Sequence, residues 1–234
     1  MWNGKKKAIT FSFDDGVTQD IRLVEILNKY RLKCTFNLNS GFFGLLGQVN
    51  HKGCTVAHNK VLESQVKTLY QGHEIAVHTL THPSLKMLDE ETIIRQVEED
   101  RKILSRLCGY EIVGMAYPGG SGCTDERVAE IIEKHTPIRY ARTTTATKSF
   151  DVQKSDLLLW NPTVHHTDPQ FESIVESFLA IDVSEPQLLC IWGHAYEMDT
   201  DDIPWGKFEG ICQRMSKRED IFYGTNIEVL APLL

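Results

Sequence analysis

The sequence lacks an apolar run long enough to cross a bilayer and a visible N-terminal secretory leader. Residues 1–7 lead directly into a short apolar run, residues 8–13, which Asp14 and Asp15 interrupt. A membrane-spanning helix needs about 20 predominantly apolar residues, and a leader needs an apolar segment followed by a cleavage site. We therefore expect a cytoplasmic protein with no membrane partner, although a coding start placed downstream of an export signal would look the same.

The cysteines lack the spacing of a metal knuckle or of a disulfide framework. There are six in 234 residues, none of them in a C-x-x-C pair, and they lie far apart in the chain. A small zinc site or a disulfide-rich fold needs closely grouped cysteines. The sequence therefore predicts reduced thiols, most of them packed in the core.

Positive charge is also scarce. The formal net charge is −7, and Lys5 to Lys7 form the only basic cluster. Proteins that bind nucleic acid need a basic patch to neutralise phosphates. The composition therefore argues against nucleic acid, and against any other anionic polymer, as a partner.

No repeat, low-complexity stretch or linker divides the chain, so we expect one domain covering residues 1–234. Short β-rich runs alternate with amphipathic stretches, which is typical of a parallel sheet with crossover helices. The expected strands are Ala8 to Phe13, Cys34 to Leu38, Glu74 to His78, Ile112 to Tyr117, Ile138 to Thr143, Leu157 to Val164, Gln187 to Trp192 and Ile221 to Val229. The pattern predicts an α/β fold, a compact (β/α) barrel of seven or eight parallel strands, with an open doubly wound sheet as the alternative.

Apolar stripes at helical spacing predict the helices between these strands. The stripes are Ile21, Val24 and Leu27; Ile94, Val97, Ile103, Leu104 and Leu107; Phe171, Ile174, Val175 and Phe178; and Trp205, Phe208, Ile211, Cys212 and Met215. Gly109 suits a helix C-terminus, and Asp168 before Pro169 suits a helix start. Residues 41–59, with four glycines, predict a long irregular loop near the site.

Two adjacent carboxylates, Asp14 and Asp15, end the first strand beside Gly16. Like charges are costly to bury, so such a pair needs a cation or a proton. A solvated Asp-Gly turn is the alternative. Spacing alone does not decide which aspartate would bind a metal.

His78 and His82 follow another strand end, four residues apart. Two imidazoles at this spacing can converge on one metal, and together with one carboxylate they leave coordination positions open for catalysis. Pro83 disfavours helical geometry at His82, so we expect the pair on a turn.

His194 follows the apolar run 188–193, at a further strand end. Acyl hydrolysis needs a base and an acid, and His194 is a candidate for the second role; a half-buried core histidine is the alternative. Glu197 is placed to hold His194 protonated, or else is an exposed loop acid. His165 and His166 are adjacent on a predicted strand, so we expect their rings to face opposite ways.

Four motifs occur in the order found in the polysaccharide deacetylase family, the carbohydrate esterase family 4 type with a NodB homology domain. They are Phe11 to Gly16, His78 to Pro83, Tyr117 to Gly119, and Gly193-His194. The chain resembles this family over nearly its whole length. The resemblance implies an irregular (β/α) barrel that removes acetyl or other acyl groups from sugars.

The resemblance also implies roles for single residues. Asp14 matches the general base of the family and His194 the general acid, while Asp15, His78 and His82 match the metal ligands.

Two positions depart from the family pattern. The third motif usually carries an arginine two residues before its proline, where this chain has Ala116; Arg142 is the candidate replacement. The family also often has leucine two residues before the last histidine, lining a pocket for the acetyl methyl group. This chain has Trp192 there, which makes acetyl specificity less secure than hydrolysis.

We therefore expect a hydrolase of acylated carbohydrate holding one divalent ion: zinc by default, with cobalt, nickel or iron acceptable to the same ligands. A backbone N–H near Gly119 is expected to stabilise the oxyanion, and Tyr117 to line the substrate pocket with Trp192. A hydrolase of the same fold acting on a small amide or ureide is the main alternative, and a carbohydrate-binding pseudoenzyme is another. The bond type, N-acyl or O-acyl, and the oligomeric state stay open.

Overall fold

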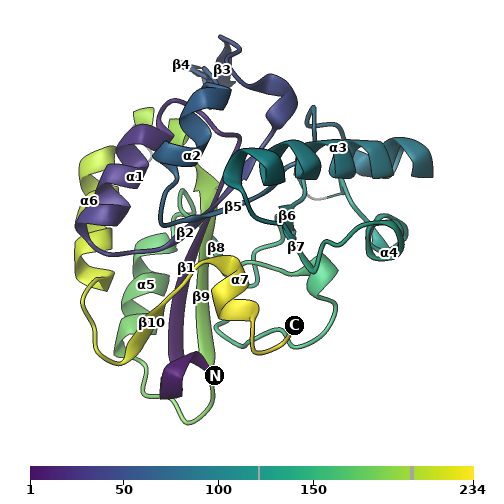
Figure 1. Cartoon of the computed structure of the whole chain (residues 1–234). Helices are drawn as coiled ribbons and strands as arrows, with labels where there is room; N and C mark the ends of the chain where they lie inside the picture. The colour runs from purple at the N-terminus through teal and green to yellow at the C-terminus, as the bar shows by residue number, and fades with distance from the viewer. Residues whose placement is uncertain (121, 201–202) are drawn as a thin grey trace.

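A computed structural model describes residues 1–120, 122–200 and 203–234. Its main sheet contains eight parallel strands among these residues, in the order β7-β6-β5-β2-β1-β9-β8, with β10 paired to β1. The strands are β1 (Lys7–Asp14), β2 (Cys34–Leu38), β5 (Glu74–Val77), β6 (Gly114–Ala116), β7 (Tyr140–Arg142), β8 (Val164–His165), β9 (Gln187–His194) and β10 (Ile221–Tyr223). The sheet curls as the expected irregular (β/α) barrel does, and the open doubly wound alternative is not adopted (Figure 1).

β1 is the centre of the sheet. Every residue from Lys7 to Asp14 is buried, and each of them pairs with a residue of β9. On the other side, the second half of β1 pairs with β2 and the first half with β10. A strand enclosed on both edges and both faces is mostly apolar, which agrees with the short apolar run of residues 8–13 in the sequence.

Residues 160–165 connect the β7 end of the sheet with β9. Trp160 forms a parallel bridge to Arg142 at the end of β7, and the backbone N–H of Trp160 donates to Ala141 at 3.0 Å. Four residues later, at Val164, β8 begins and pairs with β9. The expected strand Leu157 to Val164 is therefore wrong as one element: residues 157–159 form a 3-10 turn, and Pro162, which has no N–H, separates the bridge from β8.

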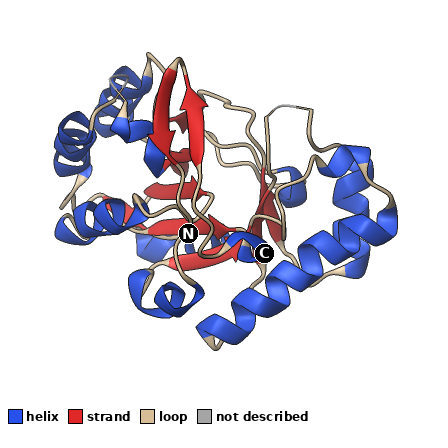
Figure 2. Cartoon of the chain, turned by 90° about the horizontal axis from the view of Figure 1, so that it is seen from above, coloured by secondary structure: helices blue, strands red, loops and turns tan. Residues whose placement is uncertain are grey.

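Helices surround the strands on the outside, as the view from above shows (Figure 2). They are α1 (Asp20–Lys29), α2 (Val66–Leu69), α3 (Glu90–Cys108), α4 (Glu126–His135), α5 (Phe171–Ala180), α6 (Trp205–Met215) and α7 (Asn226–Leu230). α3 begins where the Asp89 side chain accepts the N–H of Thr92 and ends at Gly109 with φ 81°, as expected. None of the described helices is long and apolar enough to span a membrane.

Three other details of the sequence interpretation are wrong. Ile21 is 41% exposed, and the buried face of α1 is made by Leu23, Val24, Ile26 and Leu27. The expected strand Ile221 to Val229 ends at Tyr223, because the Thr225 and Glu228 side chains form a capping box that starts α7. Helix α5 starts at Phe171, and Asp168 caps the turn before it by accepting the Gln170 N–H at 2.8 Å.

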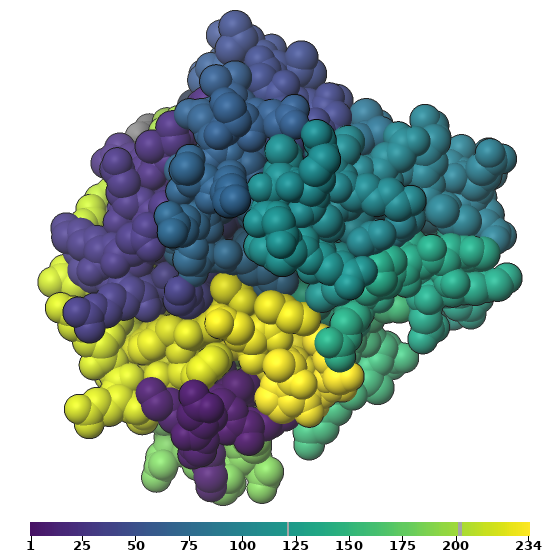
Figure 3. All heavy atoms as spheres, in the orientation of Figure 1, coloured from purple at the N-terminus to yellow at the C-terminus, as the bar shows by residue number. Residues whose placement is uncertain are grey.

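The segment 41–59 also departs from expectation, because it contains a β-hairpin. β3 (Gln48–His51) pairs antiparallel with β4 (Cys54–Ala57). Lys52 and Gly53 both have positive φ in the turn, the conformation that suits a two-residue hairpin loop. Both strands are short and largely exposed, so they show little apolar alternation. The hairpin projects at the top of the molecule (Figure 1 and Figure 3).

Candidate functional site

The candidate site forms where the parallel strands β1, β5, β7 and β9 end, since the carboxyl ends of parallel strands meet at one rim of a barrel. Asp14 closes β1 and lies opposite His194 in the register with β9. The backbone turns at Asp15, whose φ is 84°. This turn is how two consecutive carboxylates reach different partners.

Asp15, His78 and His82 come together. Oδ1 of Asp15 lies 3.8 Å from Nε2 of His78 and 3.7 Å from Nε2 of His82, and the three ligand atoms lie within 4.8 Å of one another. His78 donates its Nδ1–H to the carbonyl of Ala116 at 2.9 Å, which leaves Nε2 as the free lone pair. That nitrogen is buried and has no hydrogen-bond partner among the described residues.

This donor set fits a divalent metal ion. Metal-binding histidines usually donate their second ring nitrogen to a carbonyl or carboxylate, as His78 does. Two imidazoles with one carboxylate suit zinc and leave open positions. Burial lowers the pKa of His78 to about 4, so this ring is neutral and able to coordinate at neutral pH.

Two residues that sequence reasoning missed also hold Asp15. Nε2 of His58 lies 2.9 Å from Oδ2 of Asp15, and the buried ammonium of Lys60 donates to the Asp15 carbonyl at 2.7 Å. Burial raises the pKa of Asp15, but the His58 hydrogen bond and nearby positive charges outweigh it and bring that pKa well below its ordinary value. His58 directly follows β4, in the segment 41–59 that was expected to be an irregular loop, and Lys60 lies just beyond that segment.

Asp14 faces Arg142 in the barrel interior. Nη2 of Arg142 lies 2.5 Å from each Asp14 oxygen, Nε donates to Ser12 Oγ at 3.0 Å, and the guanidinium lies over the Trp192 ring at 4.8 Å. Asn37 donates to Oδ1 of Asp14 at 2.8 Å. Burial raises the pKa of Asp14, but the Arg142 charge and hydrogen bond, together with the nearby His78 and His194, outweigh burial and lower that pKa, so the carboxylate stays ionised.

His194 lies beside Glu197. Its Nδ1 is 3.4 Å from Oε1 of Glu197, and its backbone N–H donates to Oε2 at 3.1 Å. Burial lowers the pKa of His194, but the carboxylates of Glu197, Asp15 and Asp14 outweigh it and raise that pKa to about 9. Glu197 is buried, at 4% exposure, so it is no exposed loop acid. The structure thus puts a protonated imidazole opposite an ionised Asp14.

His165 and His166 do not face opposite ways as expected. Their rings stack with centroids 4.9 Å apart, and both approach Glu197. The reason is that β8 ends at His165, so strand alternation does not extend to His166.

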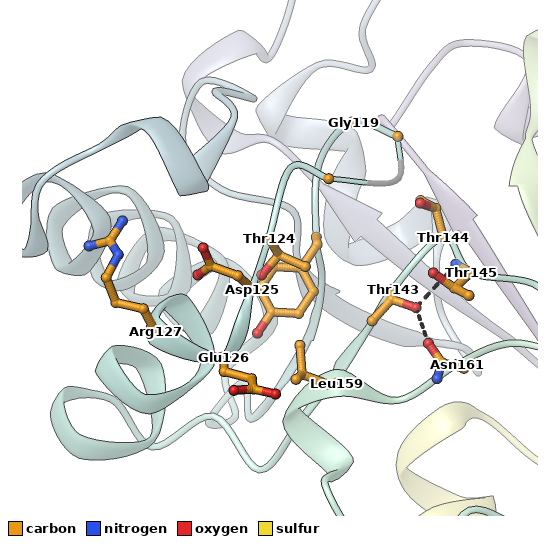
Figure 4. Close-up of a pocket in the computed structure, with 13 residues that line it drawn as sticks. Gly119, Thr124, Asp125, Glu126, Arg127, Thr143, Thr144, Thr145, Leu159 and Asn161 are labelled. Carbon is orange, nitrogen blue, oxygen red and sulfur yellow. Dashed lines mark hydrogen bonds between the residues drawn. The ribbon is translucent and has the colours of Figure 1, made fainter.

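Two cavities open beside residues of the sequence motifs, and the smaller one borders two of the proposed metal ligands. One of about 390 Å³ borders Asp15, His58 and His82. The other, of about 600 Å³, is lined by Tyr117, Gly119 and polar side chains including Thr143 and Asn161 (Figure 4). Sugars are recognised by polar groups of this kind on a concave surface.

Gly119 and Tyr117 have defined positions at the larger cavity. Gly119 has φ 80°, and a Cβ there would lie 2.7 Å from Cys123 Sγ, so a side chain is excluded. The Tyr117 hydroxyl donates to the Leu158 carbonyl at 2.8 Å. Trp192 packs edge-on against His165, with centroids 4.4 Å apart. Their parts in catalysis or substrate binding stay predictions.

Comparison with known proteins gives two partial relatives. A peptidoglycan-N-acetylglucosamine deacetylase of Bacillus cereus is 27% identical over 107 residues, which are 45% of this chain and 34% of that protein. The peptidoglycan-N-acetylmuramic acid deacetylase PdaC of Bacillus subtilis is 26% identical over 123 residues, 52% of this chain and 23% of that protein. The matches therefore span about a third of one relative and a quarter of the other.

Solved structures share the fold. A family 4 carbohydrate esterase from Streptomyces lividans, in complex with acetate, has a TM-score of 0.58 and 14% identity, covering 94% of this chain and 93% of its own. A Bacillus anthracis protein described as a pseudoenzyme of the same family has a TM-score of 0.55 and 15% identity, covering 96% of this chain and 66% of its own. Active and inactive proteins thus share this barrel, and the fold alone does not decide activity.

The family model for polysaccharide deacetylases matches residues 2–139. The matched segment holds Asp14, Asp15, His78 and His82, and it ends before Arg142 and His194. Because the model matches more than half of the chain, and the fold agrees, this protein belongs to the polysaccharide deacetylase family.

Proposed function

We propose that this chain is a metal-dependent hydrolase that removes acetyl groups from an acylated sugar. One observation carries the proposal: an ionised Asp14 ends β1, the next residue, Asp15, meets His78 and His82 after β5, and His194 lies opposite Asp14 on β9. A base, a metal-binding set and an acid therefore share one rim. A pseudoenzyme has no need of all three.

Each residue of the site has its own role in the proposed reaction. A divalent ion held by Asp15, His78 and His82 would supply Lewis-acid activation of the acyl carbonyl and of the attacking water. Asp14 accepts the proton of that water, with its rotamer fixed by Arg142. His194, kept protonated by Glu197, donates a proton to the departing amine or alcohol. The backbone beside Gly119 can approach the oxyanion closely, because no side chain stands in the way.

The substrate class follows from the relatives and from the larger cavity. The Bacillus relatives are named as deacetylases of N-acetylglucosamine and N-acetylmuramic acid in peptidoglycan. The cavity beside Gly119 carries hydroxyl, amide and charged side chains around about 600 Å³. We infer an N-acetylated amino sugar in an oligo- or polysaccharide as the substrate. The expected cytoplasmic address stays a prediction.

Acetate release tests the proposal. Zinc-loaded protein would be incubated with N-acetylglucosamine oligomers, peptidoglycan and O-acetylated xylan, with small amides and ureides assayed alongside. We expect acetate from the N-acetylated glycans, and none from the Asp14→Asn variant under the same conditions. Turnover confined to the small amides or ureides would assign the chain to the alternative reaction. No turnover of any substrate by the metal-loaded protein would indicate a pseudoenzyme.

A further inference from the structure

A second group of metal-binding side chains lies apart from the proposed catalytic set. It consists of His165 and His166 at the end of β8, with Glu197 in the 3-10 turn after β9. Oε2 of Glu197 is 3.3 Å from Nε2 of His165 and 3.6 Å from Nε2 of His166. The three ligand atoms lie within 4.8 Å of one another. None of these residues belongs to the Asp15–His78–His82 set.

The protonation of His166 points to a cation in this group. Its Nδ1 lies 3.3 Å from the Trp192 carbonyl, and a carbonyl can only accept, so Nδ1 carries the proton. Nε2 then presents a bare lone pair towards an ionised carboxylate. This nitrogen is fully buried and has no hydrogen-bond partner among the described residues. Two acceptors facing each other in a buried place need a positive charge between them.

The ring of His166 is held firmly in this direction. It packs against Phe13 at 5.3 Å and Phe208 at 6.0 Å between centroids. Gly193 makes room for it, because a Cβ there would lie 1.9 Å from Nδ1. Rotation of the ring towards another partner is therefore blocked.

The arrangement repeats that of the first set. His78 also donates Nδ1–H to a strand-end carbonyl and directs a bare, buried Nε2 at a carboxylate. Ligand atoms about 2.0–2.1 Å from a tetrahedral ion lie about 3.3–3.4 Å apart. The separations of 3.3 Å and 3.6 Å around Glu197 Oε2 are close to this value, and they are longer than a good N–H···O hydrogen bond.

His165 takes part through the tautomer that carries its proton on Nδ1. Nδ1 lies 2.8 Å from the Thr167 hydroxyl, and in the other tautomer it accepts the Thr167 N–H at 3.2 Å. A hydroxyl accepts as well as donates, so metal binding at Nε2 requires Nδ1–H to donate to the Thr167 hydroxyl in place of the N–H contact. The rings of His194 and His51 approach the other carboxylate oxygen, Oε1, with their Nδ1 atoms at 3.4 Å and 3.8 Å. Oε2 is the oxygen that faces the rings of His165 and His166.

We propose that Nε2 of His165, Nε2 of His166 and Oε2 of Glu197 bind a second divalent cation of zinc-like character. Two nitrogens and one oxygen are ligands that such ions accept, with further positions left for water. The proposal concerns binding only and holds whether or not the chain is a hydrolase. It raises the expected metal content from one ion to two per chain.

Metal stoichiometry tests the second site. Purified chain would be stripped with chelator, titrated with Zn²⁺ by calorimetry, and analysed for bound zinc after gel filtration. We expect two ions in the wild type and in the control variant His135→Gln, which changes a histidine on α4 that pairs with Glu90. His166→Gln and Glu197→Gln should each retain one ion, with at least a tenfold weaker second event. His82→Ala should also retain one, and His82→Ala/His166→Gln none.

His165→Asn covers the case in which His166→Gln fails to fold, because the His165 side chain is part-exposed, at 19%. Circular dichroism melting would establish that each variant is folded. Two ions in folded His165→Asn and Glu197→Gln proteins would overturn the proposal. The proposal would also be overturned if the wild type bound one ion and His82→Ala bound none. The positive charge between His166 and Glu197 would then be a shared proton and not a metal ion. Activity is not read in this experiment, so failure of the proposed reaction leaves its result unchanged.

Discussion

Arg142 contacts Asp14 across the interior of the barrel, although β6, β5 and β2 separate their strands in the sheet. The residues lie 128 positions apart, and one guanidinium nitrogen reaches both carboxylate oxygens at 2.5 Å. Ala116, where the family pattern has arginine, lies beside Arg142 in the register of β6 and β7. The arginine beside Asp14 therefore comes from β7, one strand further along than the position of Ala116 on β6.

Arg142→Lys should reduce kcat on the order of 10²-fold with little change in KM. A lysine ammonium is a point charge and cannot contact Asp14, Ser12 and the Thr143 carbonyl from one planar group as Arg142 does. Displacing the base by about 1 Å carries a loss of this size. Steady-state kinetics of acetate release would measure it. Unchanged kcat would show that Arg142 has no part in positioning Asp14.

Arg142→Ala should lower the free energy of unfolding by roughly 3–5 kcal/mol, since it leaves the buried Asp14 charge unpaired. Urea unfolding would measure the loss. Adding Asp14→Asn to this variant should restore part of it, because the unpaired charge is then absent. The pairing would be contradicted if the double variant lost as much unfolding free energy as the two single variants lose together.

Asp14→Asn should reduce turnover by roughly 10²- to 10⁴-fold, the range for removal of a general base. Its metal content should stay the same, because Asp14 faces Arg142 while Asp15 faces the histidines. Kinetics and elemental analysis of one preparation would measure both quantities. Full activity of the variant would show that Asp14 is a turn residue and not the base. A loss of zinc would show that Asp14 is a metal ligand.

His82→Ala should remove one ion per chain and abolish turnover, because it deletes one of three ligands of the proposed catalytic metal. Chelator treatment of the wild type should also abolish turnover, and added Zn²⁺ or Co²⁺ should restore turnover only in the wild type. His135→Ala, on α4, is the matched control. Retention of the full metal content by His82→Ala would refute the assignment.

Asp20 should make the fold less stable as pH rises. Its carboxyl is fully buried, Oδ1 has no partner among the described residues, and Oδ2 accepts from the Tyr70 hydroxyl at 2.7 Å. Burial raises the pKa of Asp20 from 3.8 to about 8. Between these values the folded chain keeps the proton and the unfolded chain has lost it, so stability is fully present below the lower pKa and is lost towards the higher one.

The expected slope is up to about 1.4 kcal/mol per pH unit for this group. Urea unfolding of the metal-free protein at pH 5, 6 and 7 would measure it. Asp20→Asn should flatten the dependence, whereas Asp182→Asn, in an exposed position, should keep the wild-type slope. Identical slopes in wild type and Asp20→Asn would contradict a protonated Asp20.

Local strand patterns predicted the barrel, whereas the family resemblance singled out Asp15, His78 and His82; the structure brings these three side chains together, and their metal binding stays a prediction. β1 and β9 are long and buried, and His78 and His82 follow a strand end with Pro83 after them. Arg142 was predicted from a gap in a motif, and the structure puts its guanidinium on Asp14. Its effect on catalysis stays a prediction.

The remaining contacts depend on tertiary geometry that has no local signature. His58 reaches Asp15 from behind a hairpin whose strands are short and exposed. Glu197 gathers His165, His166 and His194 only because β8 stops at His165 and the chain turns after β9. The sequence prediction extended strand alternation beyond the end of β8 and therefore assigned the wrong direction to the His166 ring.

The pairing of every β1 residue with β9 also bears on the order in which the molecule is made. A nascent chain that has emerged only as far as residue 139 carries Asp14 and all three proposed ligands of the first metal, but β1 still has an open edge. Arg142 and His194 follow later, and contacts of such sequence separation form slowly. Synthesis therefore completes the metal ligands before the partners of the base, and an unpaired β1 is the stretch most in need of protection from aggregation meanwhile.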